Sequence, residues 1–220
     1  YKKEILSSRV EGTLLLINAL KGKPHTVKKV VSASAIGIYP DSLINYYDED
    51  YKVVDDSFLS HVVKEWEHVV DEFSKLNITV SKIRIGLVLS NKGGALMEMV
   101  KPIKLYLGSA FGDGKQWQSW IHINDLARLF LYVLRNELSG VYNGVSPNSV
   151  TNLELTNSIA KTLNKNVLLP NTPRFLMNLV LGEMHTLLFL SQRVSSKKIE
   201  NRGFQFKNHH LQSALEDLLS

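Results

Sequence analysis

The chain contains 220 residues, of which 44% are hydrophobic and 21% are charged, a composition typical of one globular domain or of one domain with a small appendage. Its formal net charge of +5 comes from dispersed basic residues, so no nucleic-acid-binding stripe is predicted, and no run of about 18 apolar residues predicts a membrane span. Cysteine is absent, which excludes disulfides and thiolate metal sites and fits a cytoplasmic protein without a metal.

The first part of the chain alternates between a helical and a strand pattern. Residues 3–20 have helical spacing, and Gly22 and Pro24 end the helix. An α/β unit rarely begins on a crossover helix, so we expect an upstream segment, and a domain that starts here naturally is the alternative. A short apolar strand over 27–31 follows, and after it come four small residues, Ser32, Ala33, Ser34 and Ala35. Small residues at the carboxyl end of a strand leave room for a ligand.

The most regular helical pattern covers residues 57–76, and the next strand covers 78–85. The order helix, strand, helix, strand predicts an α/β fold with a parallel, Rossmann-like sheet. The helix carries one apolar stripe formed by Leu59, Val62, Val63, Trp66, Val69, Val70, Phe73 and Leu76. Its predicted solvent face consists of Ser60, His61, Lys64, Glu65, His68, Asp71 and Glu72.

Later elements are shorter. We expect a helix over 95–106 after Gly93 and Gly94, an extended segment over 117–123, and a helix to Asn136 that Asn124 and Asp125 cap. The remaining predicted elements are a strand over 140–144, a helix from the capping box 151–154 to about 163, a short strand over 167–169, a helical pattern from Pro173, and a last helix near 210–219 beyond Gly203 and Phe204.

Five segments together resemble the extended branch of the short-chain dehydrogenase/reductase family, the NAD-dependent epimerases and dehydratases. They are Arg9-Val-Glu-Gly-Thr13, Ser34-Ala-Ile-Gly-Ile-Tyr39, Trp66-Glu67, Arg84-Ile-Gly-Leu-Val88 and Trp120-Ile-His-Ile-Asn-Asp125. A closer similarity is to an atypical subgroup, the epimerase-family proteins, through Gly93-Gly94-Ala95, Ser119-Trp-Ile-His122, Gln192-Arg-Val194 and Gly203-Phe204. The resemblance implies part of an NAD(P)-binding Rossmann-like domain over 1–165 and a helical C-terminal module of unknown function over 166–220.

The sequence departs from this family at its catalytic pair. The family uses a Tyr and a Lys four residues apart on one helix face as its acid and base. None of the tyrosines here has a Lys at that spacing, and the matching positions are Phe58 or Leu59 with Val62 or Val63. A pair formed by Ser60 and Lys64 is conceivable, but both residues are predicted to lie on the solvent face.

The resemblance implies a set of site residues. The candidate catalytic residues are Ser34 and Tyr39, although Tyr39 as a ring packed under the loop is an equal alternative. The cofactor NAD or NADP is expected at Ser32, Ala33, Ser34, Arg84, Gly86 and Leu87. The substrate is expected at Gly93, Gly94, Trp120 and His122. The alternatives are a plain turn for the two glycines, core packing for Trp120 and a structural role for His122.

The function implied is an NAD(P)-dependent oxidoreductase or isomerase, similar to the nucleotide-sugar epimerases, with a small-molecule substrate. The alternative is a non-catalytic NAD(P)-binding regulatory or sensor protein on the same fold. Gln118 occupies a position where the family often has an Arg for the substrate's diphosphate, which makes a nucleotide sugar a poor expectation. A homodimer is compatible with the sequence.

Overall fold

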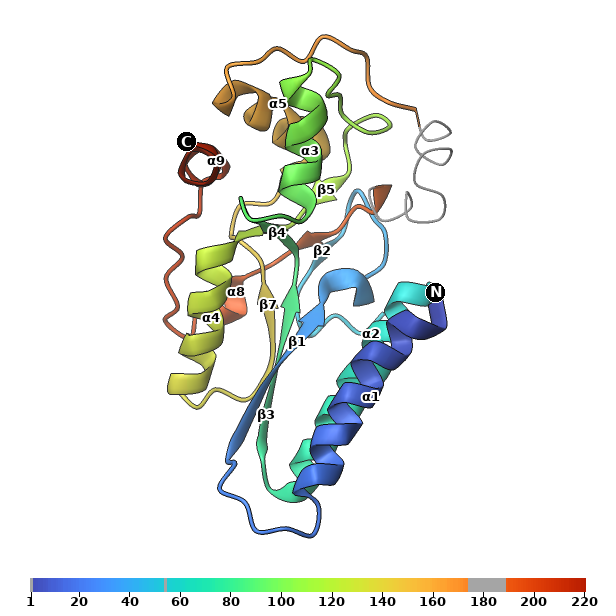
Figure 1. Ribbon diagram of the computed structural model, residues 1–220, viewed down its shortest axis with the longest axis vertical. Helices are drawn as coiled ribbons and strands as arrows, with labels where there is room; N and C mark the ends of the chain where they lie inside the picture. The colour runs from blue at the N-terminus through green and yellow to red at the C-terminus, as the bar shows by residue number, and fades with distance from the viewer. Residues whose placement is uncertain (1, 54, 174–188) are drawn as a thin grey trace.

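The molecule is built around a short parallel sheet with helices on both faces (Figure 1). The structure is a computed structural model, and it describes residues 2–53, 55–173 and 189–220. The sheet has the order β1-β3-β7, formed by β1 (Lys29–Ala35), β3 (Thr79–Ile85) and β7 (Gly140–Gly144). Ser34 is opposite Arg84, which is opposite Asn143, so the carboxyl ends of all three strands lie at one edge. The predicted α/β fold with a parallel sheet is confirmed.

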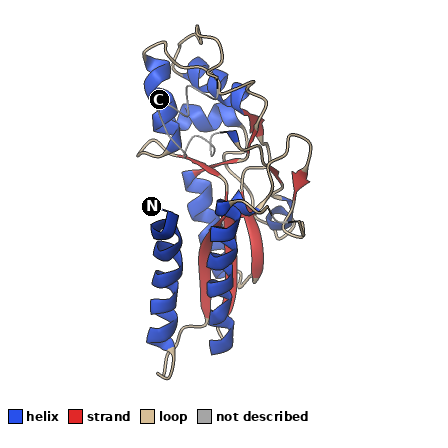
Figure 2. Cartoon of the chain, turned by 90° about the vertical axis from the view of Figure 1, so that its right-hand side faces the viewer, coloured by secondary structure: helices blue, strands red, loops and turns tan. Residues whose placement is uncertain are grey.

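Two long helices cover one face of this sheet, and a third covers the other (Figure 1). The helices α1 (Lys2–Leu20) and α2 (Phe58–Asp71) lie side by side, as Figure 2 also shows, and α4 (Ile123–Arg135) lies opposite them. Ile17 of α1 is buried in one cluster with Val69 of α2. The apolar stripe predicted for α2 therefore packs inward, as the spacing of its residues requires.

Ser60 is a correction to the predicted solvent face of α2. Its side chain is fully buried, and its hydroxyl donates to the backbone oxygen of Ile38 at 3.4 Å. A small hydroxyl fits on the buried side of a helix when a nearby carbonyl accepts its proton. The Ser60 hydroxyl is thus used in anchoring the loop after β1 to the helix.

A second group of helices packs beyond the carboxyl ends of the strands (Figure 1). It consists of α3 (Ala95–Lys104), α5 (Asn152–Thr162) and α9 (Leu211–Leu219), which share one hydrophobic core. Leu155 and Leu215 are fully buried there beside Trp120. The boundary predicted at residue 165 stays a prediction, and α9 packs against α5 from the other side of it.

Several short strands and turns join the two helix groups. The β4 strand pairs with β6 in parallel, β5 pairs with β8 antiparallel, and β2 pairs with β9 in parallel. Their bounds are β2 (Tyr46–Tyr47), β4 (Leu87–Leu89), β5 (Trp117–Gln118), β6 (Trp120–His122), β8 (Val150–Thr151) and β9 (Arg193–Val194). The remaining helical turns are η1 (Ile36–Ile38), η2 (Glu72–Leu76) and α8 (Lys197–Glu200).

Some predicted boundaries were wrong. The first strand continues through the small residues to Ala35, because its backbone pairs with β3 along its whole length. The segment 167–169 is not a strand. The capping box of Thr151 and Glu154 is confirmed, whereas the helical pattern expected from Pro173 falls largely on 174–188, outside the described residues.

The cap of α4 is a further correction. His122 occupies the N-cap position, and its Nδ1 accepts the backbone N–H of Asn124 at 3.1 Å. Asp125 instead accepts the backbone N–H groups of Lys207 and Asn208 at 3.1 and 2.7 Å. The carboxylate thus fastens the C-terminal segment to the start of α4.

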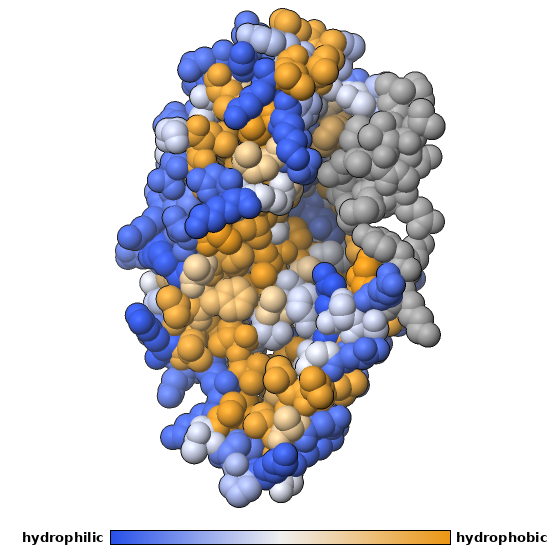
Figure 3. Space-filling model, viewed as in Figure 1, coloured by the Kyte–Doolittle hydropathy of each residue, from blue (hydrophilic) through white to orange (hydrophobic). Residues whose placement is uncertain are grey.

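Apolar side chains gather across the middle of the face shown in Figure 3, between the two helix groups. Within the described residues, no helix is both long and apolar enough to cross a bilayer.

Candidate functional site

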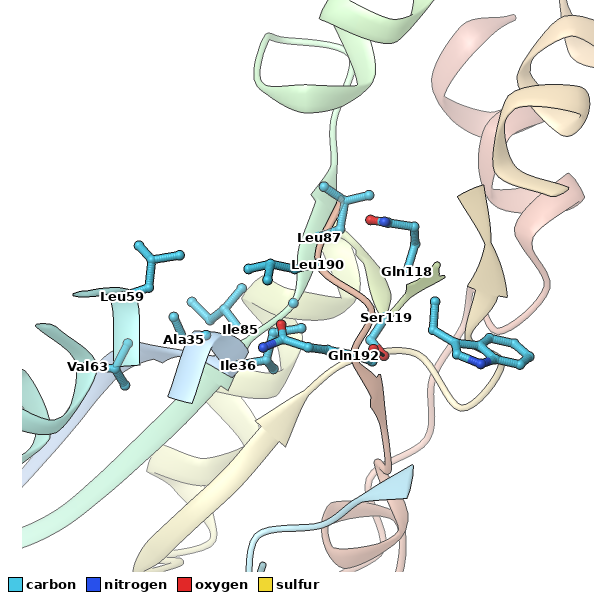
Figure 4. A pocket seen from close by; sticks show the side chains of 13 residues that line it. Ala35, Ile36, Leu59, Val63, Ile85, Leu87, Gln118, Ser119, Leu190 and Gln192 are labelled. Carbon is cyan, nitrogen blue, oxygen red and sulfur yellow. Dashed lines mark hydrogen bonds between the residues drawn. The ribbon is translucent and has the colours of Figure 1, made fainter. Parts of the chain in front are cut away.

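A pocket of about 290 Å³ lies at the carboxyl ends of β1 and β3, beside the first turns of α2 (Figure 4). This is the place where open parallel sheets bind ligands, because the strand ends and the following loops leave a crevice there. The described residues that line it are Ala35, Ile36, Gly37, Leu59, Val63, Ile85, Gly86, Leu87, Trp117, Gln118, Ser119, Leu190 and Gln192.

Gly86 allows the backbone after β3 to approach the backbone of Ser119 closely beside this pocket. A Cβ atom on Gly86 would lie 2.1 Å from the backbone oxygen of Ser119, a distance that no side chain tolerates. The next residue, Leu87, donates its backbone N–H to the same oxygen at 2.8 Å. Glycine is therefore required where β3 turns into β4, since two backbones meet there.

Leu59 and Val63 are the α2 side chains that line the pocket (Figure 4). They are four residues apart, so they lie one above the other on the same helix face. The alternative positions Phe58 and Val62 do not line it. Leu59 and Val63 are therefore the residues that face the pocket with the spacing of the Tyr–Lys pair, and neither has a proton to transfer.

A buried ion pair joins β3 to α2 below the pocket. The Arg84 guanidinium donates from Nε and Nη2 to the two carboxylate oxygens of Glu67 at 2.8 and 3.0 Å, and the Ser34 hydroxyl donates to the same carboxylate at 2.5 Å. Burial alone would raise the pKa of Glu67, but the Arg84 guanidinium, the Ser34 hydroxyl and Lys82 together hold it below its usual value. Glu67 is thus an ionised anchor.

Tyr39 is locked into the same network. Its hydroxyl donates to Asn143 Oδ1 at 2.8 Å and accepts from Arg84 Nη1 at 3.0 Å, and its ring stacks on Tyr47 with centroids 5.3 Å apart. The side chain is 2% exposed, and burial raises its pKa to about 12 despite the nearby Arg84. A Tyr acid of this family needs a lowered pKa, so both the hydrogen bonds and the burial disfavour proton transfer by Tyr39.

The predicted cofactor residues divide into two groups. Gly86 and Leu87 line the pocket, and so does Ala35, the neighbour of Ser34. Ser32, Ala33, Ser34 and Arg84 lie in the strands that lead to it and do not line it. The catalytic roles of Ser34 and Tyr39 and the cofactor contacts stay predictions.

The predicted substrate residues do not line the pocket. Trp120 is fully buried in the core and donates Nε1–H to the backbone oxygen of Asn148 at 2.8 Å. His122 is equally buried, and its Nε2 lies 3.1 Å from Asp217 Oδ2 of α9. Gly93 and Gly94 precede α3, where both adopt positive φ angles. Their binding roles stay predictions, and their positions agree with the structural alternatives.

The sequence did not point to Ser119 and Gln192 as pocket residues. Gln192 Nε2 donates to the backbone oxygen of Tyr39 at 2.5 Å, and the Ser119 hydroxyl donates to the backbone oxygen of Gln192 at 2.7 Å. Both residues belong to motifs that the chain shares with the epimerase-family proteins, Ser119-Trp-Ile-His122 and Gln192-Arg-Val194. These motifs were the sequence signal that could have indicated the two pocket residues. Among the residues that the structure describes, no cluster of His, Asp and Glu could hold a metal ion.

Comparison with protein families and curated proteins identifies relatives of this chain. Residues 172–218 match a domain of unknown function (DUF1731). The whole chain is 39% identical over 224 residues to the epimerase family protein SAR0825 of Staphylococcus aureus (strain MRSA252), and it covers 73% of that protein.

Solved structures with the same fold include two relatives at 30% identity or more. The human epimerase family protein SDR39U1 (isoform 2), solved with NADPH, is 33% identical with a TM-score of 0.91, and the match covers 99% of this chain and 74% of that one. The nucleoside-diphosphate sugar epimerase of Corynebacterium glutamicum is 30% identical with a TM-score of 0.78, with coverage of 99% and 43%.

Proposed function

The chain belongs to the epimerase family of proteins, and from this premise we propose that it binds NAD or NADP with the nicotinamide in the pocket at the ends of β1 and β3. The observation that carries the proposal is the position of Leu59 and Val63, which face this pocket from α2 as the family's Tyr and Lys would. The human relative solved with NADPH supports the same cofactor class.

The pocket fits a flat ring such as the nicotinamide, which is uncharged in the reduced cofactor. Ala35 and Gly37 have little or no side chain, which leaves room beside the strand ends. Leu59, Val63 and Leu87 provide apolar walls that exclude water from a bound ring. A bound nicotinamide would supply hydride chemistry, and the walls of this chain would orient it and keep it dry.

The chemistry available to the chain's own residues is limited. General acid–base catalysis contributes roughly 10²–10⁴-fold to a rate, and neither Leu59 nor Val63 can provide it. We therefore expect turnover of nucleotide sugars to be low, and an oxidoreductase or isomerase of another small molecule remains the proposed activity. A non-catalytic NAD(P)-binding sensor is the second candidate, because the buried Tyr39 hydroxyl is already hydrogen-bonded.

Titration of the protein with NADPH and with NADH, followed by cofactor fluorescence, tests the binding proposal. We expect saturable binding of at least one of them, and no binding of either would contradict the proposal. A panel of nucleotide sugars assayed with the bound cofactor tests the chemistry, because fast epimerisation would show that an unassigned residue transfers the proton. The homodimer and the cytoplasmic location stay proposals, and sedimentation and fractionation test them.

A further inference from the structure

The walls of the pocket carry no formal charge. Its described lining has aliphatic side chains on most sides, and Asp, Glu, Lys, Arg and His are absent from it (Figure 4). A carboxylate or phosphate that entered it would lose its hydration without meeting a cation among the described lining residues. Burial of an unpaired charge is costly, so the lining selects against anionic groups.

Two cations on β3, the strand that leads to the pocket, are already neutralised, and Arg193, which stacks on the ring of Trp117, is not among the described lining residues. Arg84, which lies in β3 two residues before the lining residue Gly86, is paired through two hydrogen bonds with Glu67. Lys82 lies 2.7 Å from the carboxylate of Asp71. A ligand anion would have to compete with these carboxylates for either cation, at the cost of leaving a carboxylate unpaired.

Gln118 is the polar side chain of the pocket that has room for a ligand. Within the described part of the chain, its amide makes no hydrogen bond, and Figure 4 shows it extending toward Leu87. The other two polar side chains are engaged: Ser119 bonds Gln192 and Val194, and Gln192 bonds Tyr39. An amide offers both a donor and an acceptor, so it can bond a carbonyl or a hydroxyl oxygen.

We propose that this pocket takes an uncharged, mainly apolar carbonyl or alcohol compound whose oxygen is hydrogen-bonded by Gln118. The proposal rests on the proposed function, in which the same pocket receives the nicotinamide. The volume of about 290 Å³ is near the lower end of ligand pockets, which are roughly 300–1,000 Å³. Because the nicotinamide ring occupies part of this volume, the compound is no larger than a single substituted ring.

Binding of acetophenone and of benzoate, a matched ketone and carboxylate, tests this proposal by saturation-transfer NMR with and without NADPH. We expect acetophenone to bind at least about tenfold more tightly than benzoate, because the carboxylate loses its hydration. Gln118→Leu should weaken acetophenone binding by about three- to tenfold, the contribution of one neutral hydrogen bond. Gln205→Leu, which changes an exposed glutamine elsewhere, should have no effect.

Gln118→Arg adds the missing cation and should reverse the preference toward benzoate. Equal or tighter binding of benzoate by the unchanged protein, no binding of acetophenone, or an unaltered acetophenone affinity in Gln118→Leu would each overturn the proposal. Failure of NADPH to bind while acetophenone is still preferred would contradict the cofactor proposal alone, because the measurement without cofactor reports on the pocket directly.

Discussion

Glu67 holds together the polar residues beneath the pocket. Its two carboxylate oxygens accept from Arg84 and Ser34, and Arg84 in turn bonds Tyr39. All four side chains are buried, so each hydrogen bond has little competition from water. Removing one partner of such a pair leaves the other charge buried and unpaired, which costs about 3–5 kcal/mol.

Glu67→Gln tests this network through its pH dependence. The pKa of Glu67 is held below its usual value in the folded protein, so its stabilising contribution is present above the unfolded pKa of about 4.3 and is lost as the pH falls through the folded pKa. Urea unfolding should show the protein more stable than Glu67→Gln at pH 7, with the difference shrinking below about pH 4. A difference that is constant with pH would contradict the assignment. Glu65→Gln, on the same helix, is the control.

Leu59→Tyr combined with Val63→Lys tests the missing acid. The double variant places a phenol and an ammonium on the helix face that lines the pocket. We expect NADPH-dependent reduction of small ketones to rise by roughly 10²-fold, the lower end of acid–base contributions. Leu59→Phe with Val63→Met fills the same positions without a proton donor and should leave the rate unchanged. An equal rise in both variants would point to packing and not to acid catalysis.

At the scale of the elements, the sequence predicted α2 well, because the period of its apolar residues is local information, and the two glycines of 140–144 marked the bounds of β7. It ended the first strand too early, since Ser32, Ala33 and Ser34 have low strand propensity and are held by pairing with β3. It also assigned the cap of α4 to Asn124 and Asp125. The true partners of Asp125, Lys207 and Asn208, lie about 80 residues later, and no local pattern reveals them.

The structure confirms the predicted capping box at the start of α5, and its contribution to stability can be tested. The Thr151 side chain accepts the backbone N–H of Glu154 at 3.2 Å, and the Glu154 carboxylate accepts the backbone N–H of Thr151 at 2.6 Å. Thr151→Ala should lower the free energy of unfolding by about 1 kcal/mol in urea titrations. Asn157→Ala, at an exposed position of the same helix, should be neutral or slightly stabilising because alanine has the higher helix propensity. A loss in Asn157→Ala equal to that in Thr151→Ala would contradict the cap.

At the scale of the whole molecule, the pocket is assembled from segments far apart in the chain. Leu59, Gln118 and Gln192 come from α2, from β5 and from the residue before β9. The sequence located the strand ends, because these follow from the α/β order. It could not show that Gln192 reaches Tyr39, because that contact depends on the parallel pairing of β9 with β2.

The last helix shares its core with α5, so we expect it to fold together with the rest of the chain. Leu215 is fully buried between these helices, and Leu215→Ala should lower the free energy of unfolding by about 2–5 kcal/mol. The whole chain should still unfold in one transition, seen equally by tryptophan fluorescence and by circular dichroism. An early separate transition would show that the C-terminal module, predicted over 166–220, is independent. Ser213→Ala, exposed on the same helix, is the control.

The most direct test of the central claim is the affinity for NADPH, measured by calorimetry, when the pocket is filled from α2. Leu59→Trp places a larger side chain in the pocket, whereas Leu105→Trp makes the same change at a residue that is 69% exposed after α3. If the nicotinamide occupies the pocket between β1, β3 and α2, Leu59→Trp should weaken NADPH binding by at least about tenfold, and Leu105→Trp should not change it. Equal affinities in both variants, with both folded by circular dichroism, would contradict the claim.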